Sequence, residues 1–426
     1  LQSWGMLSDF FGFNKHIGVN FHWIHELVMF LILTGMAIID LGRSLLAKVL
    51  VENELKAVNE RLELGRTVQS MLLPTSMEGE IGRFSYRYYY DPAEKMSGDW
   101  LSIWRSEERN HLFLGDVVGR LFRECEPLPP VSCAVVHPCD ASALRGALEA
   151  ARHGMITPVL VGPQAKIQAV AQAEGLDLNG HRIVHTEHSH AAAEAAVAMA
   201  RSGEVQALMK GSMHTDELMA AVVPSATGLR TGRRISHVFV MDVPAYPRML
   251  LVTDAAINIA PDIVGKVDIV QNAIDLAHVL GVAQPKVAIL AAVETVNPEM
   301  PATIDAAMLC KMADRGQITG GLVDGPLAFD NAVSLEAAHT KKITSEVAGQ
   351  ADILVVPNLE AGNMVAKQLQ YLAGADSAGI VLGTRVPMIL TSRADSVRTR
   401  LASAAVLKLL AHAQAAKQGK KVGGQA

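Results

Sequence analysis

The stretch VQALMKGSMHTDELM at residues 205–219 decides the fold. Residues 205–209 are a short apolar run typical of a buried strand, and Thr215 can cap a helix that follows. Between them, a glycine allows close backbone approach, free N–H groups face the loop and Lys210 adds a cation. The stretch predicts a strand, an anion-binding loop and a helix, although many strand-to-helix loops look similar. The loop residues that we expect to contact a ligand are Lys210, Gly211, Ser212 and Thr215.

On both sides of this stretch, apolar runs alternate with helical patterns, and this continues to the end of the chain. The alternation predicts βαβ units and an α/β fold with a mainly parallel sheet. No GxGxxG or GxxxxGK[ST] pattern supports a dinucleotide or P-loop site. The predicted strands are 132–137, 159–162, 205–209, 238–241, 250–253, 287–291, 353–356 and 388–390; the predicted helices are 141–152, 191–201, 266–280, 362–372 and 398–415.

Composition narrows the class of protein. The 426 residues suggest two or three domains, and 50% hydrophobic with 19% charged residues excludes disorder for most of the chain. Lys plus Arg number 38 against 43 Asp plus Glu, so no basic surplus exists for binding nucleic acid. The four cysteines lack CxxC spacing, which argues against a zinc site or a disulfide framework and predicts a reduced, cytoplasmic setting.

The first 65 residues are predicted to hold an apolar segment and an amphipathic helix. Residues 27–39 (LVMFLILTGMAII) are shorter than the ~20 residues that span a bilayer, and extension toward residue 21 adds His22, His25 and Glu26. Two interpretations stay open: the last transmembrane helix of a truncated sensor, with membrane contact through residues 21–41, or a buried or interfacial helix.

Residues 66–120 contain a VQ–LLP helix pattern, a PA…SGD element and a GDVVG element. Asp99 and Asp116 end strand-like runs, and two such carboxylates could hold Mg²⁺ or Mn²⁺. The ordered set resembles the start of the metal-dependent serine phosphatase family of bacterial stress-response regulators, with Ser97 in place of a usual glycine. The resemblance stops before the later metal-binding elements. We therefore expect a truncated, non-catalytic α+β fragment, joined naturally or artificially near residues 124–130 (ECEPLPP).

Further candidate residues come from the strand-to-helix loops, because ligands of open α/β sheets sit at the carboxyl ends of strands. Loop 324–331 offers Asp324, and loop 357–363 offers Asn363. Loop 391–396 (TSRADS) places a hydroxyl, a guanidinium and a carboxylate at the start of a helix, which suits an anion. A turn, or a helix cap with a surface arginine, is the alternative. Three arginines precede the strand at 238–241 and are candidates for phosphate contacts: Arg230, Arg233 and Arg234.

Taken together and in order, these motifs resemble the phosphate acetyltransferase and phosphate butyryltransferase family, most of all the transferase half of bifunctional enoyl-CoA hydratase/phosphate acetyltransferases. The motifs that carry the resemblance are VVHPCD (135–140), PVLVGP (158–163), LMKGSMHTDELM (208–219), GLRTGRRISHVFVMD (228–242), TDAAINIAPD (253–262), PKVAILAAVETVN (285–297), DGPLAFDNA (324–332), VAGQADILVVPNLEAGNMVAKQL (347–369) and LTSRADS (390–396).

The resemblance covers residues 125–426 and implies the fold and the activity. It implies an isocitrate-dehydrogenase-like fold of two parallel-sheet subdomains, at about 127–248 plus 388–426 and about 249–387. It also implies a homodimer that converts acyl-CoA and phosphate into acyl phosphate and CoA, the acyl group being acetyl or butyryl. CoA is then a substrate, and no metal or prosthetic group is bound.

The resemblance also implies roles for three residues. Ser392 and Arg393 match the Ser-Arg pair that lies at the CoA thiol and the reacting carbonyl. A carboxylate further along that helix is the base in acetyl-specific members, but Thr399 stands at its spacing. Asp395 is therefore the substitute base that we expect. Two alternatives stay open: a membrane-linked phosphatase remnant, which its incomplete motifs disfavour, and a non-catalytic CoA-binding protein.

Two remaining features are expected to be structural. Four histidines cluster within ten residues, yet they lie in a polar connector without a cysteine partner, so we expect a solvated loop rather than a metal site. Cys310 stands in a helical pattern beside apolar neighbours, which predicts a buried thiol rather than a nucleophile. The four histidines are His181, His185, His188 and His190.

Overall fold

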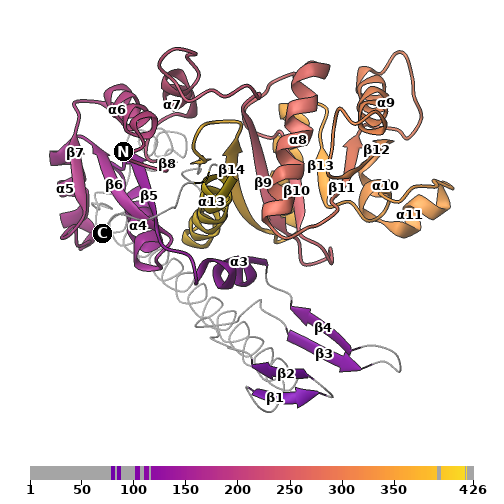
Figure 1. Cartoon of the computed structure of the whole chain (residues 1–426), viewed down its shortest axis with the longest axis horizontal. Helices are drawn as coiled ribbons and strands as arrows, with labels where there is room; N and C mark the ends of the chain where they lie inside the picture. Colours follow the sequence, from indigo (N-terminus) through magenta and orange to yellow (C-terminus); the bar gives the residue numbers. More distant parts are fainter. Residues whose placement is uncertain are drawn as a thin grey trace, which may run out of the picture. The chain divides into compact units, whose positions relative to one another are not determined.

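The computed structural model describes residues 78–81, 84–87, 101–105, 110–114, 117–390, 395–417 and 419 (Figure 1). The chain divides into two compact units, Leu1–Leu114 and Gly115–Ala426. The apolar segment at 21–41 and the two phosphatase-like aspartates, Asp99 and Asp116, lie outside the described residues. No helix in the described ranges has the length and apolar content needed to cross a membrane.

The described part of the first unit consists of two antiparallel strand pairs. In the first pair, β1 (Glu78–Ile81) aligns with β2 (Phe84–Arg87). In the second pair, β3 (Leu101–Arg105) aligns with β4 (Asn110–Leu114). The predicted phosphatase-like fragment thus contains strands, but its resemblance to the phosphatase family stays a prediction.

The second unit is built on one sheet of eleven strands. From one edge to the other these are β12 (Leu322–Leu327), β11 (Lys286–Leu290), β13 (Ile353–Val355), β10 (Leu250–Thr253), β9 (Ser236–Asp242), β14 (Asp376–Leu382), β15 (Met388–Ile389), β8 (Ala207–Lys210), β5 (Val131–Val136), β6 (Ile156–Gly162) and β7 (Arg182–His185). Most neighbours are parallel, as the alternation of apolar runs and helical patterns predicted.

An antiparallel centre divides this sheet into two parallel blocks. Strand β9 runs antiparallel to both β10 and β14, and β14 runs antiparallel to β15. Because three successive pairings are antiparallel, the block from β15 to β7 and the block from β10 to β12 point in opposite directions. The carboxyl ends of the two blocks therefore lie at opposite edges of the sheet.

Helices connect the strands and cover both faces of the sheet. Several begin with a side chain that accepts a backbone N–H, such as Asp140 before α4 and Asn358 before α12. The helices are α3 (Val117–Cys125), α4 (Ala141–Arg152), α5 (Gln164–Glu174), α6 (Ser189–Ser202), α7 (Thr215–Val222), α8 (Ile263–Val279), α9 (Pro301–Asp314), α10 (Phe329–Val333), α11 (Leu335–Thr340), α12 (Leu359–Leu372) and α13 (Val397–Lys417).

The faces of the central strands carry different helices. Leu251 packs in a core that contains buried residues of α8 and α13, which lie in front of the sheet in Figure 1. Its neighbour Val252 packs in a second core with Ala366 of α12. Since successive side chains of a strand point to opposite faces, α12 covers the face that α8 and α13 leave free. Phe239 of β9 packs against the α12 core, so alternate residues of β9 face that helix.

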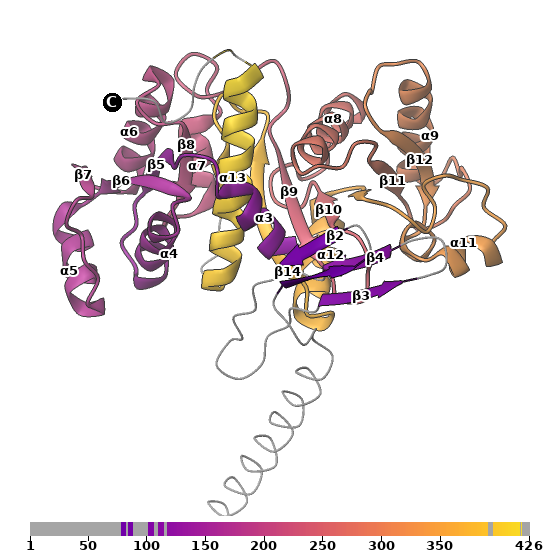
Figure 2. The ribbon, with the colours of Figure 1, turned by 60° about the horizontal axis from the view of Figure 1, so that its bottom comes forward.

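Helix α3 belongs to the second unit. Its Leu121 is buried to 1% exposure within the same core as α13, and the Cys125 thiol donates to the carbonyl oxygen of Ala405 at 3.4 Å. Figure 2 shows α3 lying along α13. The second unit therefore begins before the proline-rich segment at 127–130.

Candidate active site

A cavity of about 340 Å³ opens between the two parallel blocks of the second unit. Six parts of the chain line it: the end of β8 with the loop after it, the start of α7, strand β9, the loop after β10, helix α12, and the two residues that flank segment 391–394. The lining residues are Lys210, Met213, His214, Thr215, His237, Phe239, Ala256, Asn363, Lys367, Leu390 and Asp395. Four of the residues predicted to act in binding or catalysis thus meet here: Lys210, Thr215, Asn363 and Asp395.

Parallel pairing explains why the two most informative loops meet. Strand β15 runs beside β8 with Met388 opposite Leu208 and Ile389 opposite Met209. Strand β8 therefore ends at Lys210, level with Leu390, the residue directly after β15. Both of these residues line the cavity.

Lys210 is the buried cation of the cavity. Its side chain is 6% exposed, and its ammonium donates to the carbonyl oxygen of Met213 at 3.0 Å. Removing a charge from water costs several kcal/mol unless polar partners replace the water. A lysine held in this way beside a cavity is suited to binding an anion.

Gly211 and Ser212 fix the loop rather than line the cavity. A Cβ atom on Gly211 would lie 2.5 Å from the carbonyl oxygen of Val136, so only glycine fits beside the end of β5. The Ser212 hydroxyl accepts the Cys139 N–H at 2.9 Å and donates to the His137 carbonyl oxygen at 2.8 Å. These contacts tie the Lys210 loop to the loop after β5.

The start of α13 lies at the cavity, but residues 391–394, with Ser392 and Arg393, lie outside the described residues. Both flanks of that segment, Leu390 and Asp395, line the cavity. Asp395 is partly buried, and its carbonyl oxygen accepts a 3.4 Å hydrogen bond from the Arg400 guanidinium. Arg400 is 4% exposed, and its guanidinium also donates to the Ser142 hydroxyl at 2.8 Å.

Thr399 forms hydrogen bonds at the start of α13. It is 7% exposed, and its backbone N–H donates to the Ser396 hydroxyl oxygen at 3.1 Å. The two hydroxyl oxygens are also 3.1 Å apart. Thr399 therefore completes a helix start and does not line the cavity.

Sequence reasoning missed two residues of the cavity, His237 and Lys367. His237 is 1% exposed and packs edge-to-face on Phe239 with ring centroids 4.5 Å apart. Burial, helped by the Lys367 cation and opposed by Asp254, lowers its pKa to about 4. Lys367 donates to Gln370 of its own helix at 3.1 Å. In the sequence, a histidine inside an apolar strand looks like ordinary core, and Lys367 like the solvated face of a helix.

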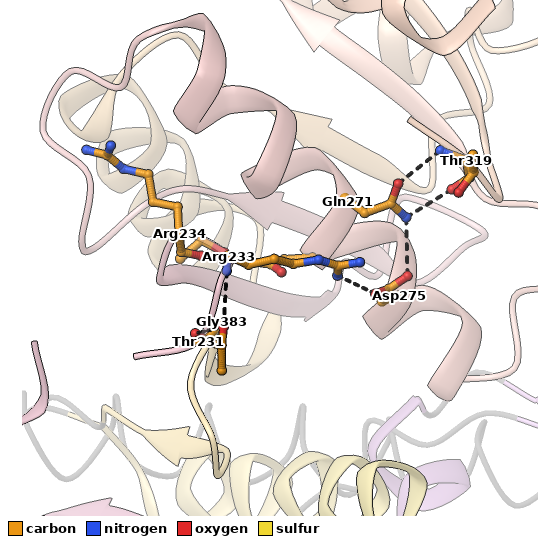
Figure 3. Close-up of polar contacts among 9 residues, drawn as sticks. Thr231, Arg233, Arg234, Gln271, Asp275, Thr319 and Gly383 are labelled. Atoms are coloured by element: carbon orange, nitrogen blue, oxygen red, sulfur yellow. Dashed lines mark hydrogen bonds and ion pairs between the residues drawn. The ribbon is translucent and has the colours of Figure 1, made fainter. Parts of the chain in front are cut away.

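The predicted arginines serve a different part of the fold. Figure 3 shows the Arg233 guanidinium directed at Asp275 of α8, with Nη1 and Oδ2 2.5 Å apart, and Arg234 extending the other way. The Arg234 guanidinium donates to Asn258 at 2.7 Å. Arg230 is exposed, and its backbone bridges to Thr384. These three arginines hold the loop before β9, and none lines the cavity.

Asp324 and Cys310 lie together, far from Lys210 in the sheet. Asp324 is on the edge strand β12, where its carboxylate accepts the Gly325 N–H at 2.8 Å. Burial raises the pKa of the Cys310 thiol to about 12, with Asp324 adding to the shift. The partly buried thiol is therefore protonated at neutral pH and lacks the thiolate character of a nucleophile.

Two histidines of the cluster accept backbone hydrogen bonds. The His188 ring accepts the Ala191 N–H at 3.2 Å and caps α6, and the His185 ring accepts the Gln164 N–H at 3.2 Å. Within the described ranges, no group of three or more His, Cys, Asp or Glu side chains is placed to hold a metal ion.

The fold and the cavity define a transferase-like α/β protein, and comparison with known proteins gives its family. Residues 190–407 match the family model "Phosphate acetyl/butaryl transferase". Phosphate acetyltransferase of Rhizobium meliloti is 62% identical over 299 residues, which are 70% of this chain and 95% of that protein. Phosphate butyryltransferase of Clostridium acetobutylicum is 44% identical over 272 residues, 64% of this chain and 90% of that protein. The chain belongs to the phosphate acetyl/butyryl transferase family.

Solved structures agree with this assignment. A branched-chain phosphotransacylase from Enterococcus faecalis V583 has a TM-score of 0.57 at 30% identity, covering 66% of this chain and 99% of its own. A phosphotransacetylase from Streptococcus pyogenes has a TM-score of 0.59 at 21% identity, covering 69% of this chain and 98% of its own, which supports the fold alone. The predicted α/β fold is confirmed.

Proposed function

We propose that the chain transfers an acetyl group between CoA and inorganic phosphate in the Lys210 cavity. The observation that carries this proposal is the convergence, in one cavity, of the buried Lys210 ammonium, Asp395 and both flanks of the segment that holds Ser392 and Arg393. Family membership supplies the reaction class, the exchange of an acyl group between CoA and phosphate.

The reaction needs an anion site, charge stabilisation and a proton route. A phosphate oxygen attacks the thioester carbon, the carbonyl oxygen becomes negative, and the carbon–sulfur bond then breaks. As it leaves, the CoA thiolate takes up the proton that the attacking hydrogen phosphate ion loses. In the reverse direction the thiol must lose that proton, which calls for a base.

We assign roles from the side chains available. Lys210 binds phosphate, Arg393 meets the charge on the carbonyl oxygen, and Ser392 positions the thiol. Asp395 accepts the thiol proton in the reverse direction, since Thr399 has no ionisable group and is buried beside Ser396.

Thr215 and Asn363 supply polar contacts at the rim of the cavity. Thr215 is the first residue of α7, so its backbone N–H has no partner within the helix. The exposed Asn363 amide donates to the Ala255 carbonyl oxygen at a long 3.4 Å, and its oxygen remains available to a substrate. We propose that both contact phosphate or the CoA chain.

The choice of acetyl rests on the higher identity to an acetyltransferase than to a butyryltransferase. Met213, Phe239 and Leu390 give the cavity an apolar side against which an acyl group can pack. Each methylene is worth only ~1–3 kcal/mol in such a pocket, so longer acyl groups should react more slowly rather than fail.

The test is CoA release by the purified chain from acetyl-, propionyl- and butyryl-CoA, with and without phosphate. We expect release only with phosphate, fastest from acetyl-CoA and unchanged after dialysis against EDTA. A folded chain without phosphate-dependent release on any of the three would contradict the proposed function. A faster rate with butyryl-CoA would contradict only the acetyl preference.

We also propose that the chain forms a homodimer, as family resemblance implies. Large apolar side chains are exposed near the starts of α8 and α12: Ile259 at 77%, Val264 at 70% and Met364 at 59%. The Leu359 N–H donates to the Ile259 carbonyl oxygen, so these two starts are adjacent. Light scattering after size exclusion should give twice the chain mass, and Val264→Glu should shift the protein toward monomer. A monomeric wild-type protein at micromolar concentration would contradict the proposal.

A further inference from the structure

His237 is a buried imidazole without a hydrogen-bond partner at the floor of the cavity. Its ring lines the cavity, its residue is 1% exposed, and Nδ1 lacks a hydrogen-bond partner. The backbone of His237 is held by a hydrogen bond in which its carbonyl oxygen accepts the Thr253 hydroxyl at 2.8 Å.

An unpaired polar side chain in this position is costly to keep. A buried polar group without a partner loses its hydrogen bonds to water, a penalty of ~1–3 kcal/mol, so such groups in native structures call for an explanation. The fold also leaves space for the ring. A Cβ atom on Gly379 of the adjacent strand β14 would lie 3.0 Å from Nε2 of His237, so glycine there accommodates the imidazole.

The surroundings of His237 keep the imidazole neutral. Burial opposes protonation most, and Lys367 of α12 acts in the same direction; together they outweigh Asp254 after β10, which favours protonation. The cavity also holds the Lys210 ammonium. A neutral imidazole has one N–H donor, and at this pKa it is too weak a base to take the proton of a thiol near neutral pH.

We propose that His237 is a catalytic residue whose neutral imidazole donates its N–H to the acyl carbonyl oxygen as that oxygen becomes negative. This inference rests on the proposed function, because it needs a thioester in the cavity. When phosphate attacks, the electron pair of the C=O bond moves to oxygen, and the donated hydrogen bond strengthens. The pair returns as the carbon–sulfur bond breaks, and His237 keeps its proton throughout.

A neutral donor complements the cations of the cavity. Lys210 and Arg393 would bind phosphate and stabilise negative charge. However, a cation at the carbonyl oxygen of the bound thioester would also attract the phosphate, which must attack the carbonyl carbon. A neutral N–H from the floor has little attraction for phosphate and gains most when the carbonyl oxygen is negative. Its loss should therefore lower kcat rather than raise the KM for either substrate.

The test compares apolar and amide replacements of His237 in the full chain. His237→Phe keeps a planar ring without a donor, whereas His237→Asn and His237→Gln place an amide near the positions of Nδ1 and Nε2. We expect His237→Phe to lose roughly a hundredfold in kcat with little change in KM, as for removal of one oxyanion donor. At least one amide variant should exceed His237→Phe at least about tenfold in kcat, the recovery of one such hydrogen bond.

Controls separate a structural role from a catalytic one. His278→Asn is the matched control, because the His278 ring of α8 hydrogen-bonds with the Gly320 carbonyl oxygen at 2.7 Å and lies outside the cavity. Thermal denaturation reports whether each variant is folded; if His237→Phe is not folded, the smaller His237→Leu replaces it.

Three results would overturn the inference. These are a folded apolar variant with unchanged kcat, two folded amide variants no better than the apolar one, and a loss confined to KM. If the wild-type chain itself shows no phosphate-dependent CoA release, the proposed function fails first.

Discussion

Replacing Lys210 by methionine tests whether the buried cation binds phosphate. Methionine keeps an unbranched chain of similar size but removes the charge. Lys210 is 6% exposed and lies beside the cavity, so a phosphate there would meet an ammonium that water screens poorly. A hydrogen bond to a charged group contributes ~1.5–3 kcal/mol, and ~1.4 kcal/mol is a factor of ten. We expect phosphate affinity to fall by roughly ten- to a hundredfold.

The assay measures CoA release from acetyl-CoA over a range of phosphate concentrations. The KM for phosphate should rise in Lys210→Met, while the KM for acetyl-CoA changes little. Lys210→Arg should recover part of the affinity, because it restores the charge but not the shape. Lys311→Met is the matched control, since Lys311 is exposed on α9 and pairs with Asp314 at 2.6 Å.

The stability of Lys210→Met shows whether the lysine serves folding or ligand binding. A buried charge is often less favourable for folding than a methionine of similar volume, so Lys210→Met should be as stable as the wild type or more stable. If Lys210→Met loses phosphate affinity but not stability, the charge of Lys210 serves ligand binding rather than folding. An unchanged KM for phosphate would refute the reasoning, as would equal losses in stability and in both KM values, which would show that Lys210 only holds its loop.

Three further predictions use other parts of the structure. Arg393→Ala should lower kcat roughly a hundredfold, whereas Arg398→Ala, an exposed partner of Asp376, should change it little; equal small effects would place the reaction elsewhere. Leu121→Ala should lower the free energy of unfolding in urea by ~2–5 kcal/mol, because this side chain of α3 is buried; a change below ~1 kcal/mol would show that α3 packs loosely. Because the pKa of His237 is lowered from 6.5 to about 4 in the folded chain, the unfolded chain binds a proton in this pH range that the folded chain does not, and the free energy of unfolding falls as the pH falls from 6.5 to 4. In His237→Asn the free energy of unfolding should depend less on pH in this range. Equal pH dependence in the wild type and the variant would contradict this prediction.

The sequence predicts much of the secondary structure because apolar runs and helix caps act locally. The predicted strand 250–253 coincides with β10, and the predicted helix 141–152 coincides with α4, which begins after its Asp140 cap. In the second unit, β7 and β14 were missed, and β12 (Leu322–Leu327) includes Asp324, which was wrongly predicted to lie in a loop. In β14 the residues are DSAGIVL, where small Ala378 and Gly379 weaken the apolar pattern that would mark a strand.

The sequence predicts only those residues of the candidate site whose local surroundings mark them. Lys210, Thr215 and Asp395 stand in or directly beside strand-to-helix loops, where the neighbouring residue types mark them as candidates. His237 stands in the strand SHVFVMD, where its role depends on a cavity that neighbours far along the chain create. No local pattern marks such a residue, because burial and a missing hydrogen-bond partner are properties of the assembled fold.

The order of the strands explains why Asp324 does not join the cavity. Asp324 lies in β12, an edge strand of the sheet, seven strand spacings from β8 in the sheet order. At about 4.8 Å per spacing this is roughly 30 Å, too far for Asp324 to share a substrate with Lys210. Asn363 and Lys367 reach the cavity because α12 crosses the face of the sheet, and their spacing of one helical turn places both on the side toward His237.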